Sequence, residues 1–172
     1  MTTIARPERS EAAAYYFEYI DQVAPGDIRD VLAEQLKATT GFLRGISEAQ
    51  SLSRYAPDKW SIREVLNHLS DCERLFTFRA FWFARGFESA LPSFDQNVAN
   101  AAAGADSRSW NELIEEFSNI RLASISFFRS LPVDAWSRSG VASGNPCSVR
   151  ALAYMVAGHV THHVSIIRAR YL

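Results

Sequence analysis

The chain has 172 residues, of which 48% are hydrophobic and 22% are charged, and its formal net charge is -1. These values are ordinary for a globular protein, and the length suits one domain with a sizeable core, here residues 1–172. The weakly acidic chain carries no basic stripe, which argues against nucleic acid as a partner. No apolar run approaches the ~18 residues that cross a bilayer, and the first residues lack the apolar core of a signal peptide. We therefore expect a cytoplasmic protein without membrane contact, in which Cys72 and Cys147 are reduced rather than paired.

The first half of the chain predicts two long amphipathic helices. Residues 1–26 form a lead-in segment, in which residues 10–20 are expected to be a short helix that stops near Pro25-Gly26. An apolar stripe at helical spacing predicts the first long helix over residues 27–46. Ser61-Ile62-Arg63-Glu64 has the form of a capping box and predicts a second helix that ends near Gly86.

The second half predicts two more helices and a long crossover. Another capping box, Ser109 to Glu112, begins a helix over residues 109–131, and the last helix runs from Ser148 to the C-terminus. Residues 91–97 are expected to form an ordered loop between the second and third helices. Residues 139–146 are expected to form a shorter loop before the last helix, and no strand pair is expected. Four long helices with one extended crossover predict an all-α fold, a four-helix bundle.

The four histidines are concentrated on two of these helices. His68 lies on the second, and His159, His162 and His163 lie on the last. His159 and His163 are four residues apart, so they project from one face, one turn apart. Both, like His68, occupy positions where the core pattern expects apolar residues, and a buried imidazole without a partner is costly. We predict that His68, His159 and His163 hold one metal ion and leave a coordination position open, as in catalytic zinc sites. The alternative is three core histidines, each hydrogen-bonded to a carbonyl or a carboxylate.

Four further residues have alternative interpretations. His162 points about 100° away from His163, which favours a supporting residue at the rim over a ligand. Asp71 lies one turn beyond His68 and is either a group that orients an imidazole or an exposed charge. Cys72 is a possible thiolate ligand, although a small buried apolar residue is the favoured interpretation. Cys147 is a weak candidate nucleophile in a loop.

Candidates for substrate binding are two aromatic residues and two arginines. Trp60 and Trp82 are expected near the open end of the site, and Arg79 and Arg121 are placed to hold a carboxylate of a small thiol or acid. The alternative is that the aromatic side chains pack in the core or in a dimer and that the arginines pair with acids of the bundle.

Two separated segments, residues 55–74 and 157–163, resemble the signature of the DinB/YfiT-like family, and the similarity extends to residues 91–95 and 148–150. The resemblance implies a bundle of DinB-type topology, often a homodimer. It also implies a divalent metal, usually zinc or nickel, held by three histidines at the positions of His68, His159 and His163. Family members include metal-dependent hydrolases, transferases that join low-molecular-weight thiols to electrophiles, and thiol-dependent isomerases.

These observations predict a metal-dependent enzyme with a small-molecule substrate. A bound divalent ion lowers the pKa of water to about 7 and deprotonates a thiol, so one ligand set serves hydrolysis and thiol transfer alike. The alternative is a non-catalytic dimeric bundle, in which the metal is structural and its coordination sphere is saturated.

Overall fold

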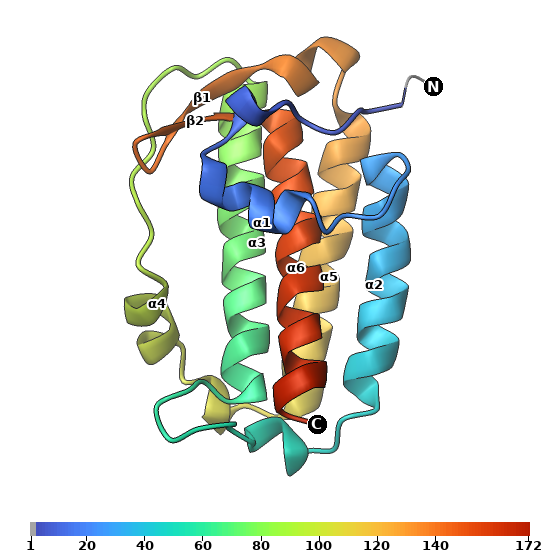
Figure 1. Ribbon diagram of the computed structural model, residues 1–172, viewed down its shortest axis with the longest axis vertical. Coiled ribbons are helices and arrows are strands. Elements are labelled where there is room, and N and C mark those ends of the chain that lie inside the picture. The colour runs from blue at the N-terminus through green and yellow to red at the C-terminus, as the bar shows by residue number, and fades with distance from the viewer. Residues whose placement is uncertain (1–2) are drawn as a thin grey trace.

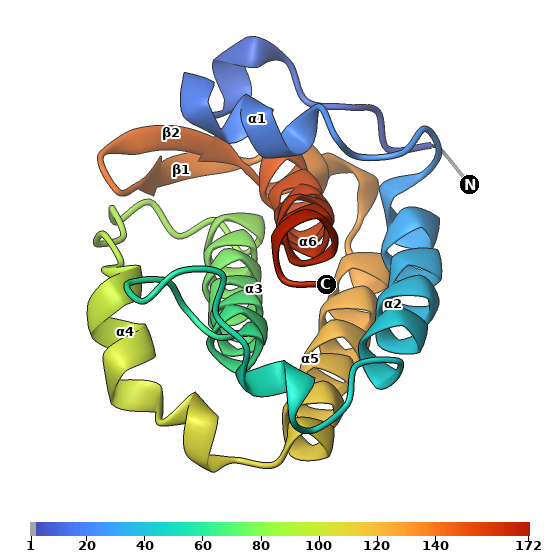
Figure 2. The same ribbon diagram turned by 60° about the horizontal axis from the view of Figure 1, so that its bottom comes forward.

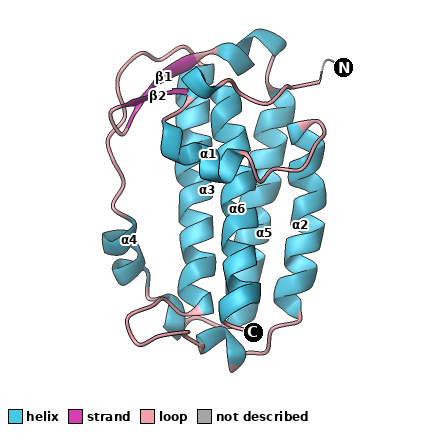
Figure 3. Cartoon of the chain, in the orientation of Figure 1, coloured by secondary structure: helices cyan, strands magenta, loops and turns pink. Residues whose placement is uncertain are grey.

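The computed structural model describes residues 3–172, and four long helices pack side by side in it (Figure 1). They are α2 (Ile28–Arg44), α3 (Ile62–Ala84), α5 (Trp110–Ser130) and α6 (Val149–Arg170). Helices make up most of the structure (Figure 3), which confirms the predicted all-α four-helix bundle. None of the helices among residues 3–172 is long and apolar enough to span a membrane.

The predicted helix starts are confirmed, because each has a side-chain cap. Asp27 accepts a hydrogen bond from the amide of Arg29 before α2, and Ser148 accepts one from Ala151 before α6. Ser61 and Ser109 each form a complete capping box with the glutamate three residues later. These bonds satisfy amides that the helix itself leaves without partners.

Helix α6 occupies the centre of the molecule, with α1 on one side and the other long helices around the rest of its surface (Figure 2). Between Val149 and Val160 every residue except Arg150 is buried. Polar side chains on this helix therefore face protein, and any that lack a partner need a chemical reason.

The predicted helix over residues 10–20 is wrong in its extent. Only α1 (Phe17–Ile20) is α-helical, and two turns of 3-10 helix, Arg9–Glu11 and Ala14–Tyr16, precede it. The Glu11 carboxylate accepts hydrogen bonds from Ser148 Oγ at 2.6 Å and Arg150 Nε at 2.7 Å. These bonds draw the lead-in toward the start of α6, and the chain is extended at Ala12 instead of helical.

The long crossover joins α3 to α5, as predicted, but it contains a helix where only a loop was expected. Helix α4 (Gln96–Ala103) lies beside α3, on the side away from α2 (Figures 1 and 2). The Asp95 side chain accepts from the amides of Asn97 and Val98 and so begins this helix. Gly104 ends it at φ 62°, in the left-handed region that favours glycine.

The expectation of no strand pair is also wrong. Strands β1 (Ser139–Ala142) and β2 (Asn145–Ser148) form an antiparallel hairpin within the predicted loop. Ser143 and Gly144 both have positive φ, 53° and 76°, as a tight two-residue hairpin turn requires. Leu91 of the crossover donates its amide to Val141 O at 2.9 Å, so the hairpin anchors the start of the crossover.

Gly158→Ala is expected to destabilise the protein by roughly 1–3 kcal/mol through overpacking. A Cβ at Gly158 would lie 2.1 Å from the carbonyl oxygen of Tyr19, so glycine permits the α1 backbone to contact α6. Thermal unfolding would measure the effect. The matched control is Gly41→Ala in α2, where a Cβ meets no atom within 4 Å; alanine there is expected to be neutral or stabilising. Equal melting temperatures for both variants would contradict the close approach.

Candidate metal centre

Helices α3 and α6 bring the three predicted ligands together. His159 Nε2 lies 3.1 Å from His68 Nε2 and 3.1 Å from His163 Nε2. The ring centroids of His68 and His163 are 5.0 Å apart. His68 and His159 are buried, and His163 is partly buried. The i, i+4 pair on one helix and the single histidine on the next therefore lie close together, and their role as metal ligands stays a prediction.

The geometry fits a divalent cation. Nitrogens 3.1 Å apart can both lie about 2.0–2.1 Å from one ion, with a nitrogen–metal–nitrogen angle of roughly 100°. His159 Nε2 faces two other ring nitrogens, yet a neutral imidazole nitrogen carries either one proton or one lone pair. His159 Nε2 therefore cannot form a regular hydrogen bond with both neighbours at once, whereas a cation between the rings would satisfy their lone pairs. The nearest polar partners of these nitrogens are one another, not the carbonyls or carboxylates expected of ordinary core histidines.

Burial keeps these imidazoles neutral, which is the form that binds metal. It lowers the pKa of His68 to about 4. Burial, with the charges of neighbouring imidazoles, lowers the pKa of His163 to about 3 and that of His159 well below its usual value. At neutral pH all three rings therefore offer lone pairs.

The metal-free protein is expected to lose stability as the pH falls from about 7 toward 4. The pKa of His68 is about 4 in the folded chain and about 6.5 in the unfolded chain. The unfolded state therefore binds more protons in this range, so stability is present above pH 6.5 and is lost on acidification. For His68 alone the loss is on the order of 3 kcal/mol. Chemical denaturation at pH 7 and pH 5, on wild type and His68→Phe, would measure it; an equal slope in both proteins would contradict the assignment.

Cys72 lies closer to the site than the favoured sequence interpretation implied. Its Sγ is 3.5 Å from His68 Nδ1 and 3.8 Å from His68 Nε2. The ligand atoms of His68, Cys72 and His159 all lie within 4.8 Å of one another. Burial raises the pKa of the Cys72 thiol to about 12, so without a metal it stays protonated. The i, i+4 spacing of His68 and Cys72 was the sequence signal for this contact.

The two residues expected to support the site lie at its edge. Asp71 accepts a hydrogen bond from Asn67 Nδ2 at 2.9 Å and pairs with Arg74, rather than contacting an imidazole. His162 is partly buried, and its Nδ1 lies 3.5 Å from Gln22 Nε2.

Two cavities reach the histidines. One, of about 160 Å³, is lined by His159, Cys72 and Arg79, together with aromatic residues of the lead-in and of α3. The other, of about 250 Å³, is lined by His163 and Trp60. The structure thus brings two of the four candidate substrate-binding residues to the site. Sequence reasoning missed the tyrosines of the lead-in that line the first cavity, Tyr15, Tyr16 and Tyr19.

Trp60 is held in place over His68. Its ring centroid lies 5.0 Å from that of His68. Its Nε1 donates to Asn100 of α4 at 3.2 Å when the Asn100 amide is turned so that its oxygen faces the indole. The crossover helix therefore helps to position an aromatic wall of the site.

The other two candidate residues lie elsewhere. Trp82 stacks on Phe87 with ring centroids 4.2 Å apart, and it lines neither of the two cavities. Arg121 is fully buried and binds Glu73 with two hydrogen bonds, of 2.7 and 2.9 Å. For Arg121 the structure matches the alternative interpretation, in which an arginine pairs with an acid of the bundle.

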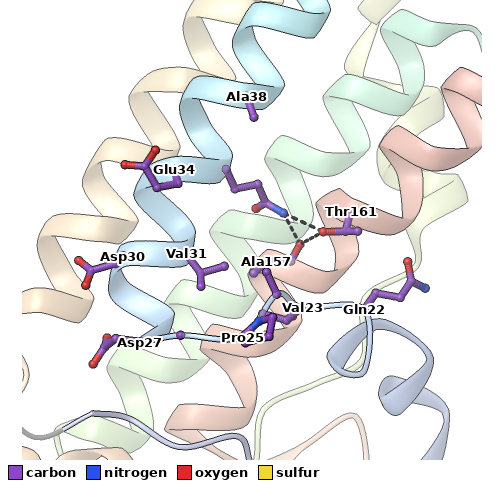
Figure 4. Close-up of a pocket in the computed structure, with 13 residues that line it drawn as sticks. Gln22, Val23, Pro25, Asp27, Asp30, Val31, Glu34, Ala38, Ala157 and Thr161 are labelled. Atoms are coloured by element: carbon purple, nitrogen blue, oxygen red, sulfur yellow. Dashed lines mark hydrogen bonds between the residues drawn. The ribbon is translucent and has the colours of Figure 1, made fainter.

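A further cavity, of about 600 Å³, lies between α2 and α6 beside residues 22–27 (Figure 4). Its acidic lining residues Asp27, Asp30 and Glu34 pair with Arg29, Arg129 and Lys37, respectively. No histidine lines it, so the metal centre and this cavity are separate features.

Comparisons with known proteins agree with this fold. The sequence profile of the DinB superfamily matches residues 31–167. YfiT from Bacillus subtilis, described as a probable metal-dependent hydrolase with an unusual four-helix bundle topology, superposes with a TM-score of 0.71 at 14% identity, over 95% of this chain and 90% of that chain. A mycothiol-dependent maleylpyruvate isomerase superposes with a TM-score of 0.62 at 13% identity, over 79% of this chain and 58% of that one. No curated protein gives a significant match.

Proposed function

Because the chain belongs to the DinB superfamily, we propose that it is a metal-dependent enzyme that acts on a small molecule. The observation that carries the proposal is the convergence of His68, His159 and His163, with successive Nε2 atoms 3.1 Å apart. Three imidazoles suit zinc or nickel as the resident ion. Such an ion would supply Lewis acidity and lower the pKa of a water or thiol that binds to it.

Transfer of a low-molecular-weight thiol to an electrophile is the reaction we favour. Two cavities, of about 160 and 250 Å³, reach the histidines, one lined by His159 and the other by His163. This arrangement suits two reactants that meet at one ion. Hydrolysis needs only one organic substrate and water, and the description of YfiT supports it as the second reaction.

The protein supplies dry, aromatic walls for this chemistry. Tyr19 and Phe76 place their ring centroids 5.3 and 5.9 Å from that of His159, and Trp60 covers His68. Water exclusion strengthens electrostatic interactions at the reacting atoms. The walls also orient the imidazoles, because ring contacts restrict their rotation.

The first experiment is elemental analysis of tag-free protein, followed by assays on the loaded protein. We expect about one zinc or nickel ion per chain, and metal-dependent consumption of a small thiol with an alkylating electrophile. Consumption of ester or amide substrates instead would favour hydrolysis. Protein that binds neither ion would overturn the proposal.

A non-catalytic metal site is the second candidate function, and the position of Cys72 favours it. A thiolate 3.8 Å from His68 Nε2 could saturate the coordination sphere of a tetrahedral ion. X-ray absorption spectroscopy of the zinc-loaded protein separates the two. A sulfur ligand that persists when a thiol substrate is added would support the structural site, whereas nitrogen and exchangeable oxygen ligands would support the enzyme.

We propose a homodimer that forms through an apolar groove of about 410 Å³ between α3 and α5, lined by Phe78, Phe81 and Phe127. Phe78 and Phe81 are exposed by 48% and 38%, and aromatic residues are enriched in such interfaces. Phe78→Ser is expected to shift the protein toward monomer in sedimentation experiments, while Val98→Ser, exposed on α4, leaves it unchanged. A wild-type protein that is monomeric in solution would contradict the proposed homodimer.

We propose that the protein is located in the cytoplasm. Cys72 and Cys147 are both free and buried, which suits a reducing compartment.

A further inference from the structure

Arg79 is a buried cation without a counter-ion. Only 3% of its surface is exposed. Its Nη2 donates to Pro92 O and to Ser143 Oγ, both at 2.8 Å, and both acceptors are uncharged. Among residues 3–172 no carboxylate lies within ion-pair distance of it, and its Nε is a buried nitrogen without a hydrogen-bond partner. An unpaired buried charge is strongly unfavourable, so this arrangement needs a ligand to complete it.

The titratable groups around Arg79 do not neutralise it. The groups that sense its charge are the Tyr16 phenol and the thiols of Cys72 and Cys147. Burial raises the pKa of the Cys147 thiol to about 12 and raises that of the Tyr16 phenol as well, so both are uncharged at neutral pH. The nearby Glu11 carboxylate is already paired with Arg150.

The cavity that Arg79 lines also reaches the metal centre. Cys72, Phe76 and Arg79 lie along one stretch of α3, about two helical turns in length, and all three line this cavity with His159. Its volume of about 160 Å³ is below the range for drug-sized ligands, which restricts the occupant to a small molecule.

We propose that Arg79 binds the carboxylate of a small organic acid whose other end reaches the histidine site. The aromatic wall formed by Tyr15, Tyr19, Phe76 and Phe94 suits a short apolar body between these two ends. This inference rests on the proposed function for the role of the ligand as a substrate, but binding of the carboxylate can be measured without metal. The substrate class of the enzyme is thereby a short carboxylic acid.

Calorimetry with hexanoate tests the proposal, with hexanamide as the neutral probe of equal size. We expect hexanoate to bind zinc-loaded and metal-free wild type, and hexanamide to bind about 10-fold more weakly or worse, because a charge-assisted hydrogen bond is lost. Arg79→Met is expected to weaken hexanoate binding by a similar factor, and Arg79→Lys to retain part of it. The matched control is Arg85→Met, which removes a guanidinium that lies over the Phe81 ring and lines no part of the cavity.

The unfolding temperature supplies a second readout. Without ligand, Arg79→Met is expected to melt at or above the wild-type temperature, because an unpaired buried charge is removed. A lower melting temperature with unchanged hexanoate affinity would show that Arg79 only holds Pro92 and Ser143, and would overturn the proposal. If Arg79→Met does not fold, the comparison of hexanoate with hexanamide on wild type and Arg79→Lys decides.

Metal analysis of the same samples separates this inference from the proposed function. Hexanoate binding that requires zinc and survives Arg79→Met would place the carboxylate on the metal, which overturns the inference and leaves the metal enzyme intact. If hexanoate binding depends on Arg79 and the protein takes up no metal, the carboxylate site is supported and the proposed metal-dependent function is contradicted.

Discussion

His159→Ala is expected to reduce the bound metal from about one ion per chain to less than about a tenth. His159 Nε2 is the nitrogen that lies 3.1 Å from both His68 Nε2 and His163 Nε2. Its removal leaves two imidazoles on different helices with no common neighbour, and two protein ligands rarely retain zinc at a catalytic site. Elemental analysis after dialysis against a weak chelator measures the loss, and far-ultraviolet circular dichroism checks that the helices remain.

His162→Ala is the matched control for this experiment. His162 is on the same helix and its ring centroid is 5.1 Å from that of His163, but its Nδ1 faces Gln22. We expect this variant to keep the full complement of metal. A stoichiometric ion in His159→Ala, or an equal loss in both variants, would be incompatible with the ligand set proposed above.

The long helices and the proximity of the three histidines could be predicted because their signals are local. Helical apolar spacing and two capping boxes define where α3 and α5 begin, and each signal lies within a few residues. The pair His159 and His163 is likewise fixed by the geometry of one helix. His68 required only the further assumption that α3 and α6 face each other.

The missed features depend on contacts between distant segments. The lead-in is not a regular helix because Glu11 binds Ser148 and Arg150, more than 130 residues away. The hairpin has strands of only four residues and a proline in β2, so its pattern is too short to stand out from a loop. Such interactions leave no periodic trace in the sequence.

The roles of the two candidate arginines also depend on contacts between distant segments, which the sequence does not show. Arg79 and Arg121 are both buried, and both are plausible anion binders from the sequence alone. The structure separates them by their partners, since Arg121 has the Glu73 carboxylate and Arg79 has none among the described residues. A buried arginine that is paired with a carboxylate has its charge compensated within the fold, whereas one without a carboxylate is available for a ligand.

Arg121 joins all four helices of the bundle. From α5 it donates to Glu73 on α3, to Gln35 Oε1 on α2 at 2.7 Å and to Val156 O on α6 at 3.4 Å. Gln35 in turn donates to Ala157 O at 2.8 Å and to Thr161 Oγ1 at 2.9 Å. One fully buried guanidinium thus fixes the relative positions of the elements that carry the histidines.

Arg121→Met is accordingly expected to destabilise the protein by about 3–5 kcal/mol, because it leaves the Glu73 carboxylate buried without its partner. For a chain of this size that corresponds to a fall of roughly 6–20 °C in Tm. Chemical denaturation would measure the free energy of unfolding. The double variant Arg121→Met/Glu73→Leu removes both charges and is expected to recover much of the loss.

Arg129→Met provides the surface control on the same helix. Arg129 is about half exposed and lies 3.5 Å from the Asp30 carboxylate, so its loss is expected to cost less than about 1 kcal/mol. Similar costs for Arg121→Met and Arg129→Met, or a double variant no more stable than Arg121→Met alone, would show that the buried pair does not organise the bundle. If Arg121→Met instead leaves the stability unchanged and weakens substrate binding, Arg121 is a substrate-binding residue.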